Sequence, residues 1–132
     1  MKNETVDGRR IIDNPVYRDR LMKLQGRVMA MRANDLRLLS AKLNQKDVQL
    51  AALIVKLQGC ELRHQLEGLA IDALGESGIL YKDGHHLGDG GSWQFMYMLY
   101  LGLIIGGGTA QIQKNIISER GLGMPREPKV AK

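Results

Sequence analysis

Apolar residues recur with helical spacing in the segment that follows Asn14-Pro15. The spacing alternates between three and four positions, which places these residues on one face of an amphipathic helix. Four residues mark this face: Leu21, Leu24, Val28 and Met31. Asn is a favoured N-cap, and Pro suits the first helical position because its φ is preset and it has no amide hydrogen to leave unpaired. The pattern predicts a helix from residue 15 to about residue 44.

A second periodic stretch begins after Asn44-Gln45-Lys46 and ends near Leu74. Asp47 is a candidate cap for its first turn, and Gly75 suits its C-terminal stop because glycine tolerates the left-handed backbone found there. Two long helices joined by so short a connection pack side by side in opposite directions. The sequence up to residue 74 therefore predicts an antiparallel helical pair.

Glycine is concentrated in the next part of the chain, where ten of the 16 glycines lie between residues 75 and 108. Residues 75–91 are predicted to form an irregular loop, and Ser92 is a candidate cap for a third helix from Trp93 to Leu101 or beyond. This helix is apolar on almost every side, which is typical of a protein interior. Thr109 is a good N-cap for a fourth helix over residues 110–120.

No part of the sequence alternates convincingly between apolar and polar residues, so no strand is predicted. The predicted fold class is all-α, an up-down helical bundle of two long antiparallel helices plus two shorter C-terminal helices. We expect a single helical domain over residues 1–132. Its parts are a flexible lead-in (1–13), the bundle (14–121) and a tail (122–132).

Composition adds further limits. Of the 132 residues, 44% are hydrophobic and 25% are charged, which is typical of a folded soluble domain and excludes extended disorder. The single cysteine, Cys60, excludes an internal disulfide and is compatible with a reducing compartment. The longest apolar run, Phe95 to Ile105, has 11 residues, against the roughly 20 that cross a bilayer. We therefore expect no membrane span and, without a secretion signal, a cytoplasmic localisation.

The net charge of +5 is unevenly distributed. Residues 1–46 contain 11 basic and 5 acidic residues, which gives +6, whereas residues 47–132 contain 8 and 9, which gives −1. A basic helix can bind nucleic acid through its phosphates. Here the cations are spread around the helix, which favours a solvated or subunit-facing surface and no nucleic-acid partner. His85-His86 lacks the spacing of metal ligands and predicts a surface loop, with no metal site.

The sequence Gly106-Gly107-Gly108-Thr109, between the third and fourth predicted helices, is the most informative local feature. Glycine lets a ligand approach the backbone closely, and the unpaired amides at the start of the following helix favour an electron-rich or anionic group. The Thr109 hydroxyl is a candidate helix cap or a candidate ligand contact. A plain corner between two helices has the same pattern, so these four residues alone leave both interpretations open.

The C-terminal sequence resembles a known family. The 22 residues from Gly107 to Pro128, GGTAQIQKNIISERGLGMPREP, are similar to the C-terminal signature of the flavin-dependent acyl-CoA dehydrogenases. Upstream, residues 7–15 (DGRRIIDNP) resemble the start of the second helix of that family's C-terminal domain, and residues 70–78 (AIDALGESG) resemble the end of its third. The resemblance covers the chain from about residue 7 and implies a helical bundle that packs around FAD, partly across a subunit boundary.

The resemblance also implies roles for individual residues. Thr109 and Gln111 would contact the flavin, Gly108 would lie beside the substrate thioester, and Gly75 would be the surviving glycine of a flavin-binding Gln-x-x-Gly-Gly motif. The implied reaction removes the α-proton of an acyl-CoA and passes the β-hydrogen to the flavin as hydride. Electrons then leave to an electron-transferring flavoprotein. The other implied partner is the remainder of the dehydrogenase or a partner subunit, in an oligomer.

The chain departs from the family pattern at two places. Many relatives have a glutamate base at the position of Gly107, which has no side chain, so no catalytic residue is assigned. Asp72 and Glu76 stand where the family has Gln and Gly, and their charge would repel a pyrophosphate unless it is paired. The two carboxylates would equally be ordinary solvated residues at a helix end.

Two functional interpretations follow from the resemblance. The first is the C-terminal helical portion of a flavin-dependent acyl-CoA dehydrogenase, inactive by itself because it would lack the base and two of the family's three domains. The alternative is a non-catalytic interaction subunit of a heteromeric acyl-CoA dehydrogenase that has lost the base and the flavin contacts. The sequence leaves open whether this chain is an enzyme.

Overall fold

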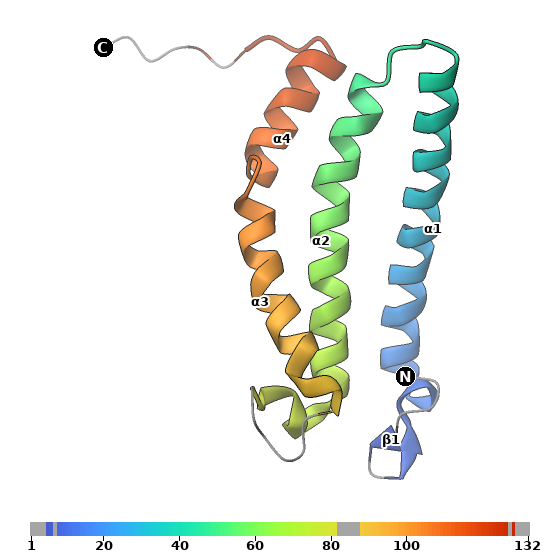
Figure 1. Ribbon diagram of the computed structural model, residues 1–132, viewed down its shortest axis with the longest axis vertical. Helices are drawn as coiled ribbons and strands as arrows, with labels where there is room; N and C mark the ends of the chain where they lie inside the picture. Colours follow the sequence, from blue (N-terminus) through green and yellow to red (C-terminus); the bar gives the residue numbers. More distant parts are fainter. Residues whose placement is uncertain (1–4, 7, 82–87, 127, 129–132) are drawn as a thin grey trace.

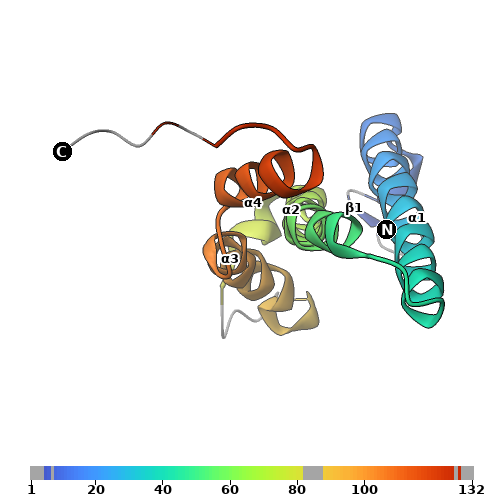
Figure 2. The ribbon, with the colours of Figure 1, turned by 90° about the horizontal axis from the view of Figure 1, so that it is seen from above.

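The computed structural model describes residues 5–6, 8–81, 88–126 and 128. The helices α1 (Pro15–Leu43) and α2 (Gln49–Ala73) run antiparallel (Figure 1). α3 (Ser92–Ile105) returns along the other side of α2, and α4 (Ala110–Ile116) follows it in the same direction. Seen from above, α2 lies between α1 and the α3–α4 column (Figure 2). The prediction of an all-α bundle with two long and two shorter helices is confirmed.

Two predicted helix-end signals are confirmed. The Asn14 side chain accepts a hydrogen bond from the Val16 amide at 2.9 Å, and Pro15 occupies the first position of α1. After the last turn of α2, Gly75 has φ +58, a left-handed conformation that glycine adopts without the steric cost of a Cβ atom. The backbone therefore leaves α2 at the residue that the sequence predicts.

The start of α2 differs from the prediction. Gln45 takes a left-handed conformation with φ +54, and the Lys46 amide donates to the Ala41 carbonyl at 2.9 Å. The chain therefore leaves α1 through a Schellman-type C-terminal turn. Because this ending uses the chain as far as Lys46, α2 begins only after Val48, which provides no side-chain cap. The prediction that Asp47 caps α2 is wrong for this reason.

The glycine-rich segment is more regular than predicted. Gly75–Ile79 and Gly88–Gly91 form short 3-10 helices. Gly91, with φ +74, precedes α3, so Ser92 is the first residue of that helix and the prediction that it is the cap is wrong. Residues 82–87, which include the His85-His86 pair, lie outside the described residues.

The last helix begins as predicted and ends differently. The Ile112 amide donates to the Thr109 hydroxyl at 3.3 Å, which confirms Thr109 as the N-cap of α4. After α4 the backbone stays helical but widens into a π-helical turn, Ile117–Gly121, so the predicted extent to about Arg120 is confirmed and only the type of the last turn differs. The widened turn brings Gly121 against Leu50 of α2, so close that a Cβ atom on this glycine would clash.

A short antiparallel pair precedes the helices, although the sequence predicts no strand. β1 (Thr5–Val6) pairs with β2 (Arg9–Arg10). Each strand has two residues, too few to show alternation between apolar and polar positions. Gly8, with φ +72, allows the turn between them, and a 3-10 turn, Ile11–Asp13, leads into α1. The prediction of a strand-free chain is therefore wrong in the N-terminal segment.

The buried core lies between α1 and α2. Leu24, Leu62 and Leu69 form it, and Leu69 is only 1% exposed. Burying one leucine side chain stabilises a fold by roughly 2 kcal/mol, so these three residues hold the antiparallel pair together. Partly buried hydrophobic residues surround them: Tyr17, Leu21, Met31 and Leu66.

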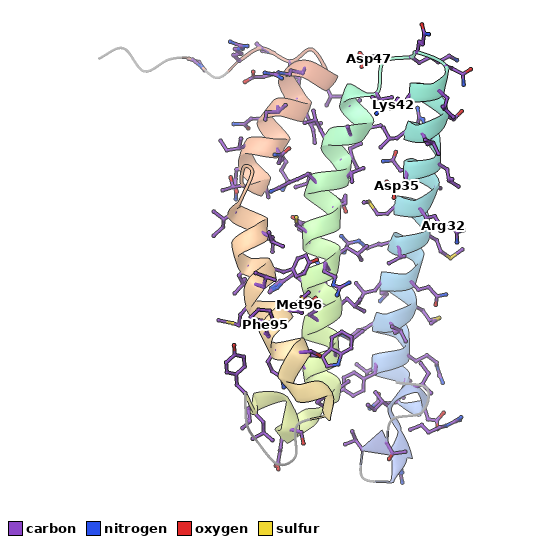
Figure 3. The ribbon with its side chains drawn as sticks, in the orientation of Figure 1. Arg32, Asp35, Lys42, Asp47, Phe95 and Met96 are labelled. Atoms are coloured by element: carbon purple, nitrogen blue, oxygen red, sulfur yellow. The ribbon has the colours of Figure 1, made fainter. Side chains whose placement is uncertain are left out.

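The α3 helix is largely exposed, whereas its sequence predicts an interior helix. Phe95, Met98 and Ile105 are 51%, 61% and 65% exposed. α3 packs against α2 on the side away from α1, and Phe95 and Met96 lie in the first half of α3 (Figure 3). Nothing in the described part of the chain covers the rest of its apolar surface, so the prediction is wrong for the chain by itself. Apolar surface of this kind marks contact sites for other protein.

One stretch, Ser92–Gly121, is apolar and long enough to cross a membrane by length and composition, with a mean hydropathy of 1.4 in its most apolar part. Its backbone is interrupted, however, because α3 ends at Ile105 and the following Gly107 and Gly108 have positive φ. The 14 residues of α3 extend about 21 Å, against roughly 30 Å of bilayer hydrocarbon. The short apolar run in the sequence therefore does not by itself exclude a span, whereas α3 alone is shorter than the hydrocarbon layer.

Candidate functional site

The connection between α3 and α4, Gly106–Thr109, is the feature that the sequence singles out; we call it the glycine turn. Gly107 and Gly108 have φ +70 and +99, conformations that a side chain would strain. Gly107 is exposed, and Gly108 and Thr109 are partly buried. A ligand that lies against this turn therefore meets backbone rather than side chains.

Two side chains from neighbouring helices hold the glycine turn. Lys56, in the middle of α2, donates through Nζ to the carbonyls of Ile104, at 3.2 Å, and of Gly108. Gln113, in α4, donates through Nε2 to the Gly107 carbonyl at 2.9 Å and is 6% exposed. Three carbonyl groups at and before the turn are thereby fixed from the protein side.

Neither Lys56 nor Gln113 is predicted as a site residue. A basic residue on an amphipathic helix normally predicts a solvated position. The available signal was its apolar surroundings, since Val55 precedes Lys56 and Leu57 follows it, and a charge in such a stretch needs a partner. Gln113 belongs to the Gln-Ile-Gln that carries the family resemblance, but its role as a tie to Gly107 depends on the fold.

Thr109 and Gln111, the predicted flavin contacts, lie together at the start of α4. The Thr109 hydroxyl accepts the Ile112 amide as a helix cap. A hydroxyl that accepts one hydrogen bond still has a proton to donate, so capping and ligand contact are compatible roles for Thr109. Gln111 is exposed and free of the packing that fixes Gln113.

Gly75, the other predicted cofactor contact, lies elsewhere. It belongs to the segment Asp72–Glu76, which we call the α2 end. Gly75 is exposed, and no described atom lies within 4 Å of the place where a Cβ would be. The glycine turn lies beside Lys56, about five helical turns, or roughly 28 Å, away along α2. One chain thus presents two separate surfaces, and Gly75 does not join Thr109 and Gln111 in a single site.

An ion pair neutralises the first departure at the α2 end. Arg20 Nη2, from α1, donates to Asp72 Oδ2 at 2.8 Å, and the Tyr17 hydroxyl donates to the Asp72 backbone carbonyl at 3.0 Å. A carboxylate paired in this way does not repel a nearby phosphate as a free one would. Glu76 is exposed, as expected for an ordinary solvated residue.

A groove of about 690 Å³ is lined both by the N-terminal segment and by the α2 end. Arg9, Arg10, Tyr17 and Asp72 contribute to its polar lining. The guanidinium of Arg10 donates through Nε and Nη2 to the two carboxylate oxygens of Asp13, at 2.9 and 2.8 Å. This hydrogen bonding lowers the pKa of Asp13 and raises the pKa of Arg10, so both groups stay charged at neutral pH.

Other candidate chemistry is sparse in the described residues. They contain no group of three or more His, Cys, Asp or Glu side chains arranged to hold a metal ion. The imidazole of His64 stacks on the Tyr97 ring with 4.1 Å between centroids. Cys60 is a partly buried free thiol. The glycine turn and the α2 end are therefore the surfaces on which a functional argument rests.

A helical bundle whose glycine turn leads into a threonine-capped last helix has a counterpart in a known family. Residues 1–122 match the family described as "Acyl-CoA dehydrogenase, C-terminal domain". Because this match covers most of the chain, the chain belongs to that family, and the resemblance seen in the sequence is confirmed.

Two curated relatives carry the same name. Acyl-CoA dehydrogenase IpdE1 of Mycobacterium tuberculosis (strain ATCC 25618 / H37Rv) is 33% identical over 117 residues, which cover 89% of this chain and 29% of that protein. Acyl-CoA dehydrogenase IpdE1 of Mycolicibacterium smegmatis (strain ATCC 700084 / mc(2)155) is 32% identical over 117 residues, 89% of this chain and 28% of that protein. The chain thus spans less than a third of the length of these relatives.

Solved structures show the same architecture. The crystal structure of the ChsE4–ChsE5 complex from Mycobacterium tuberculosis matches with a TM-score of 0.81 and 25% identity, over 96% of this chain and 32% of that one. The Tcur3481–Tcur3483 steroid ACAD matches with a TM-score of 0.78 and 21% identity, over 89% of this chain and 30% of that one. The second likeness shows a shared fold.

The residues at both surfaces fit FAD in their chemistry. At the glycine turn, the Thr109 hydroxyl and the exposed Gln111 amide provide hydrogen-bonding groups beside open backbone, which suit the polar edge of a flat ring. Gln113 Oε1 has no hydrogen-bond partner among the described residues, but it is buried and therefore not open to a ligand at this surface. At the α2 end, the open Gly75 backbone and the paired Asp72 carboxylate leave room for a phosphate.

Proposed function

We propose that this chain is the C-terminal helical portion of a flavin-dependent acyl-CoA dehydrogenase and that it acts in an assembly with further domains or a partner subunit. The observation that carries the proposal is the glycine turn, an open backbone followed by the capping Thr109 and held by Lys56 and Gln113. The proposed reaction is α,β-dehydrogenation of an acyl-CoA in the cytoplasm, with electrons delivered to an electron-transferring flavoprotein.

In this assembly the residues of the chain bind and orient. FAD, when bound, supplies the acceptor for the β-hydrogen. Thr109 and Gln111 hold the flavin, and Gly108 lies beside the thioester with φ +99, a backbone conformation that suits glycine. Gly75 contacts the cofactor that binds at the α2 end. Because roughly 28 Å of helix separates the two surfaces, we assign them to two different cofactor sites of an oligomer.

The proton chemistry requires another part of the assembly. Removal of the α-proton needs a base positioned beside the thioester. Gly107, which occupies the position of the family glutamate, has no side chain and has φ +70, a conformation suited to glycine. The base therefore comes from elsewhere, and the chain by itself is expected to be inactive.

Relatives indicate which acyl groups to test first. One matching structure is described as a steroid ACAD, and the curated relatives are acyl-CoA dehydrogenases. We infer that the substrate is an acyl-CoA and that CoA esters derived from steroids are the first to be compared with straight-chain esters.

The test uses a tagged copy of the full chain, purified from its own cells and, separately, by itself. We expect the cellular preparation to contain a larger partner and bound FAD, and to reduce an artificial electron acceptor with a steroid-derived CoA ester or with octanoyl-CoA. The chain purified by itself should contain no flavin and show no turnover. Turnover by the isolated chain, or a stable assembly without flavin, would contradict the proposal.

A second candidate function is that of a non-catalytic interaction subunit. Gly107 and the exposed apolar side of α3 favour it, because the chain keeps a surface for other protein without a base. The variants Thr109→Ala and Gln111→Ala distinguish the two. If the cofactor rests on this chain, the two variants together should weaken FAD binding by the purified assembly about tenfold or more. Full FAD content and affinity in both variants would favour the non-catalytic subunit.

A further inference from the structure

Lys56 is charged at a position where packing alone requires no charge. It is partly buried beside a small cleft that is also lined by the apolar Leu57 and Ile104 and by Glu61. Taking an ammonium group out of water costs free energy unless its donors find acceptors. Two of its three donors reach the backbone carbonyls of Ile104 and Gly108. The charge of Lys56 is thus directed at the glycine turn.

The two acceptors lie on either side of the point where the helix ends. The Ile104 carbonyl belongs to the last turn of α3, where carbonyl groups have no partner within the helix. A cation there is also favoured by the negative end of the helix dipole. The Gly108 carbonyl lies in the glycine turn itself. By binding both, Lys56 ties the end of α3 to the turn and fixes their relative position.

Peptide planarity carries this effect to the opposite side of the backbone. In a trans peptide the carbonyl and the following amide hydrogen point in opposite directions. Because Lys56 holds the Gly108 carbonyl on the α2 side, the Thr109 amide is directed away from α2. Gln113, in α4, likewise fixes the Gly107 carbonyl, so the Gly108 amide points away from the Gln113 side chain. Glycines rotate easily, so without these bonds the two amides lose their fixed direction.

We propose that Lys56 is a positioning residue for the glycine turn, directing the Thr109 amide toward bound ligand without touching that ligand. The identity of the ligand, a flavin or an acyl-CoA thioester, rests on the proposed function. The effect of Lys56 on the backbone of the turn is independent of the proposed function. The two parts are therefore tested by separate measurements.

The first measurement uses the full chain without ligand. Lys56→Met removes the charge and keeps the aliphatic stem, Lys56→Arg keeps the charge, and Lys114→Met removes a matched charge from the exposed side of α4. NMR order parameters are recorded for the amides of Gly108 and Thr109. In Lys56→Met we expect the Thr109 value to fall from about 0.85 toward 0.6 or below, while amides of α1 and α2 keep theirs. Lys56→Arg should stay near the wild-type value, and Lys114→Met should equal it.

The second measurement uses the assembled flavoprotein. Lys56→Met is expected to weaken FAD binding about tenfold, the effect of losing a hydrogen bond from a charged group, and to shift the visible absorption of the flavin. Lys56→Arg should restore both, which a residue that merely fills space would not require.

The outcomes separate the proposals. An unchanged Thr109 order parameter in a folded Lys56→Met variant, or an equal fall in Lys114→Met, would overturn the role of Lys56. If Lys56→Met does not fold, Lys56→Gln takes its place, because its shorter side chain cannot reach both carbonyls, and the same fall is expected. Failure of the wild-type assembly to bind FAD would contradict only the proposed function. The role of Lys56 is decided separately, by the order parameters.

Discussion

The glycine turn and the α2 end are built in opposite ways. At the glycine turn, positive-φ glycines are held by Lys56 and Gln113, and an added Cβ at Gly108 would lie 3.0 Å from Gln113 Nε2. At the α2 end, no described atom lies within 4 Å of the Cβ position of Gly75, and a surface ion pair, Arg20–Asp72, ties the segment to α1. One surface is fixed by hydrogen bonds to partly buried groups, and the other by contacts that water competes for.

This difference explains how each surface accommodates its departure from the family pattern. At the glycine turn, Gly107 omits a side chain and leaves the backbone ties intact, since they involve carbonyl groups and not the lost carboxylate. At the α2 end, Asp72 adds a charge, and the neighbouring helix neutralises it with Arg20. The glycine turn, whose backbone is fixed by hydrogen bonds, tolerates the loss of a side chain. The exposed α2 end tolerates a new charge because an oppositely charged residue lies within reach.

The largest predicted effect tests the rigidity of the glycine turn. Gly108→Ala places a Cβ in a backbone with φ +99 and close to Gln113. We expect the free energy of unfolding to fall by about 2–3 kcal/mol. Gly75→Ala, at φ +58 with open space around it, should lower it by only about 1 kcal/mol.

Urea titrations of the full chain followed by circular dichroism measure both changes. If the two glycines gave equal losses, or if Gly75→Ala gave the larger one, the contrast between a held and an open surface would be wrong. Gly26→Ala is the matched control, because this glycine lies within α1 with no described atom near its Cβ position. Alanine there should stabilise the helix by up to about 1 kcal/mol.

The sequence predicts the fold where one element carries its own signal. Spacing of three and four gives α1 and α2, and Asn14, Gly75 and Thr109 act at helix ends as predicted. The details that are predicted wrongly depend on contacts with other parts of the fold. Asp47 does not cap α2 because α1 ends in a wrapped turn, and the last helix widens where Gly121 meets Leu50.

The residues of the candidate site also fall into two groups, those that the sequence predicts and those that only the fold reveals. Gly108, Thr109 and Gln111 are predicted from the sequence because they lie close together in it and match a family signature. The ties from Lys56 and Arg20 join residues about fifty positions apart, which no local pattern reveals. The exposed side of α3 shows another limit of prediction from sequence. Hydropathy predicts that this surface is buried but does not identify what covers it.

A smaller effect is expected when the ion pair at the α2 end is removed. Asp72→Gln restores the residue type of the family pattern and frees Arg20. Because the side chains of Arg20 and Asp72 are 43% and 53% exposed, the free energy of unfolding should change by no more than about 0.5 kcal/mol. In the assembled flavoprotein, FAD binding should become a few-fold tighter, since the freed guanidinium can pair with phosphate.

A second surface pair provides the control for this prediction. Lys23 and Asp19 form an exposed ion pair within α1, with 2.7 Å between Nζ and Oδ2. Asp19→Asn should change stability as little as Asp72→Gln does and leave FAD binding unaltered. Equal changes in FAD affinity from both variants would show that net charge, and not the position of Arg20, controls binding at the α2 end.

The smallest predicted effect is confined to the groove beside the α2 end and depends on pH. The hydrogen bonds from Arg10 lower the pKa of Asp13 below its ordinary value of 3.8. A carboxyl group whose pKa is lowered by folding stabilises the folded state above its unfolded pKa, and the effect is lost as pH falls through the folded value. Acid should therefore loosen residues 9–13 while the glycine turn, whose described ties contain no carboxylate, stays ordered. NMR titration of the Asp13 carboxyl checks the sign: a midpoint at or above that of an unfolded peptide would contradict it, and Asp13→Asn should remove the acid dependence of this segment.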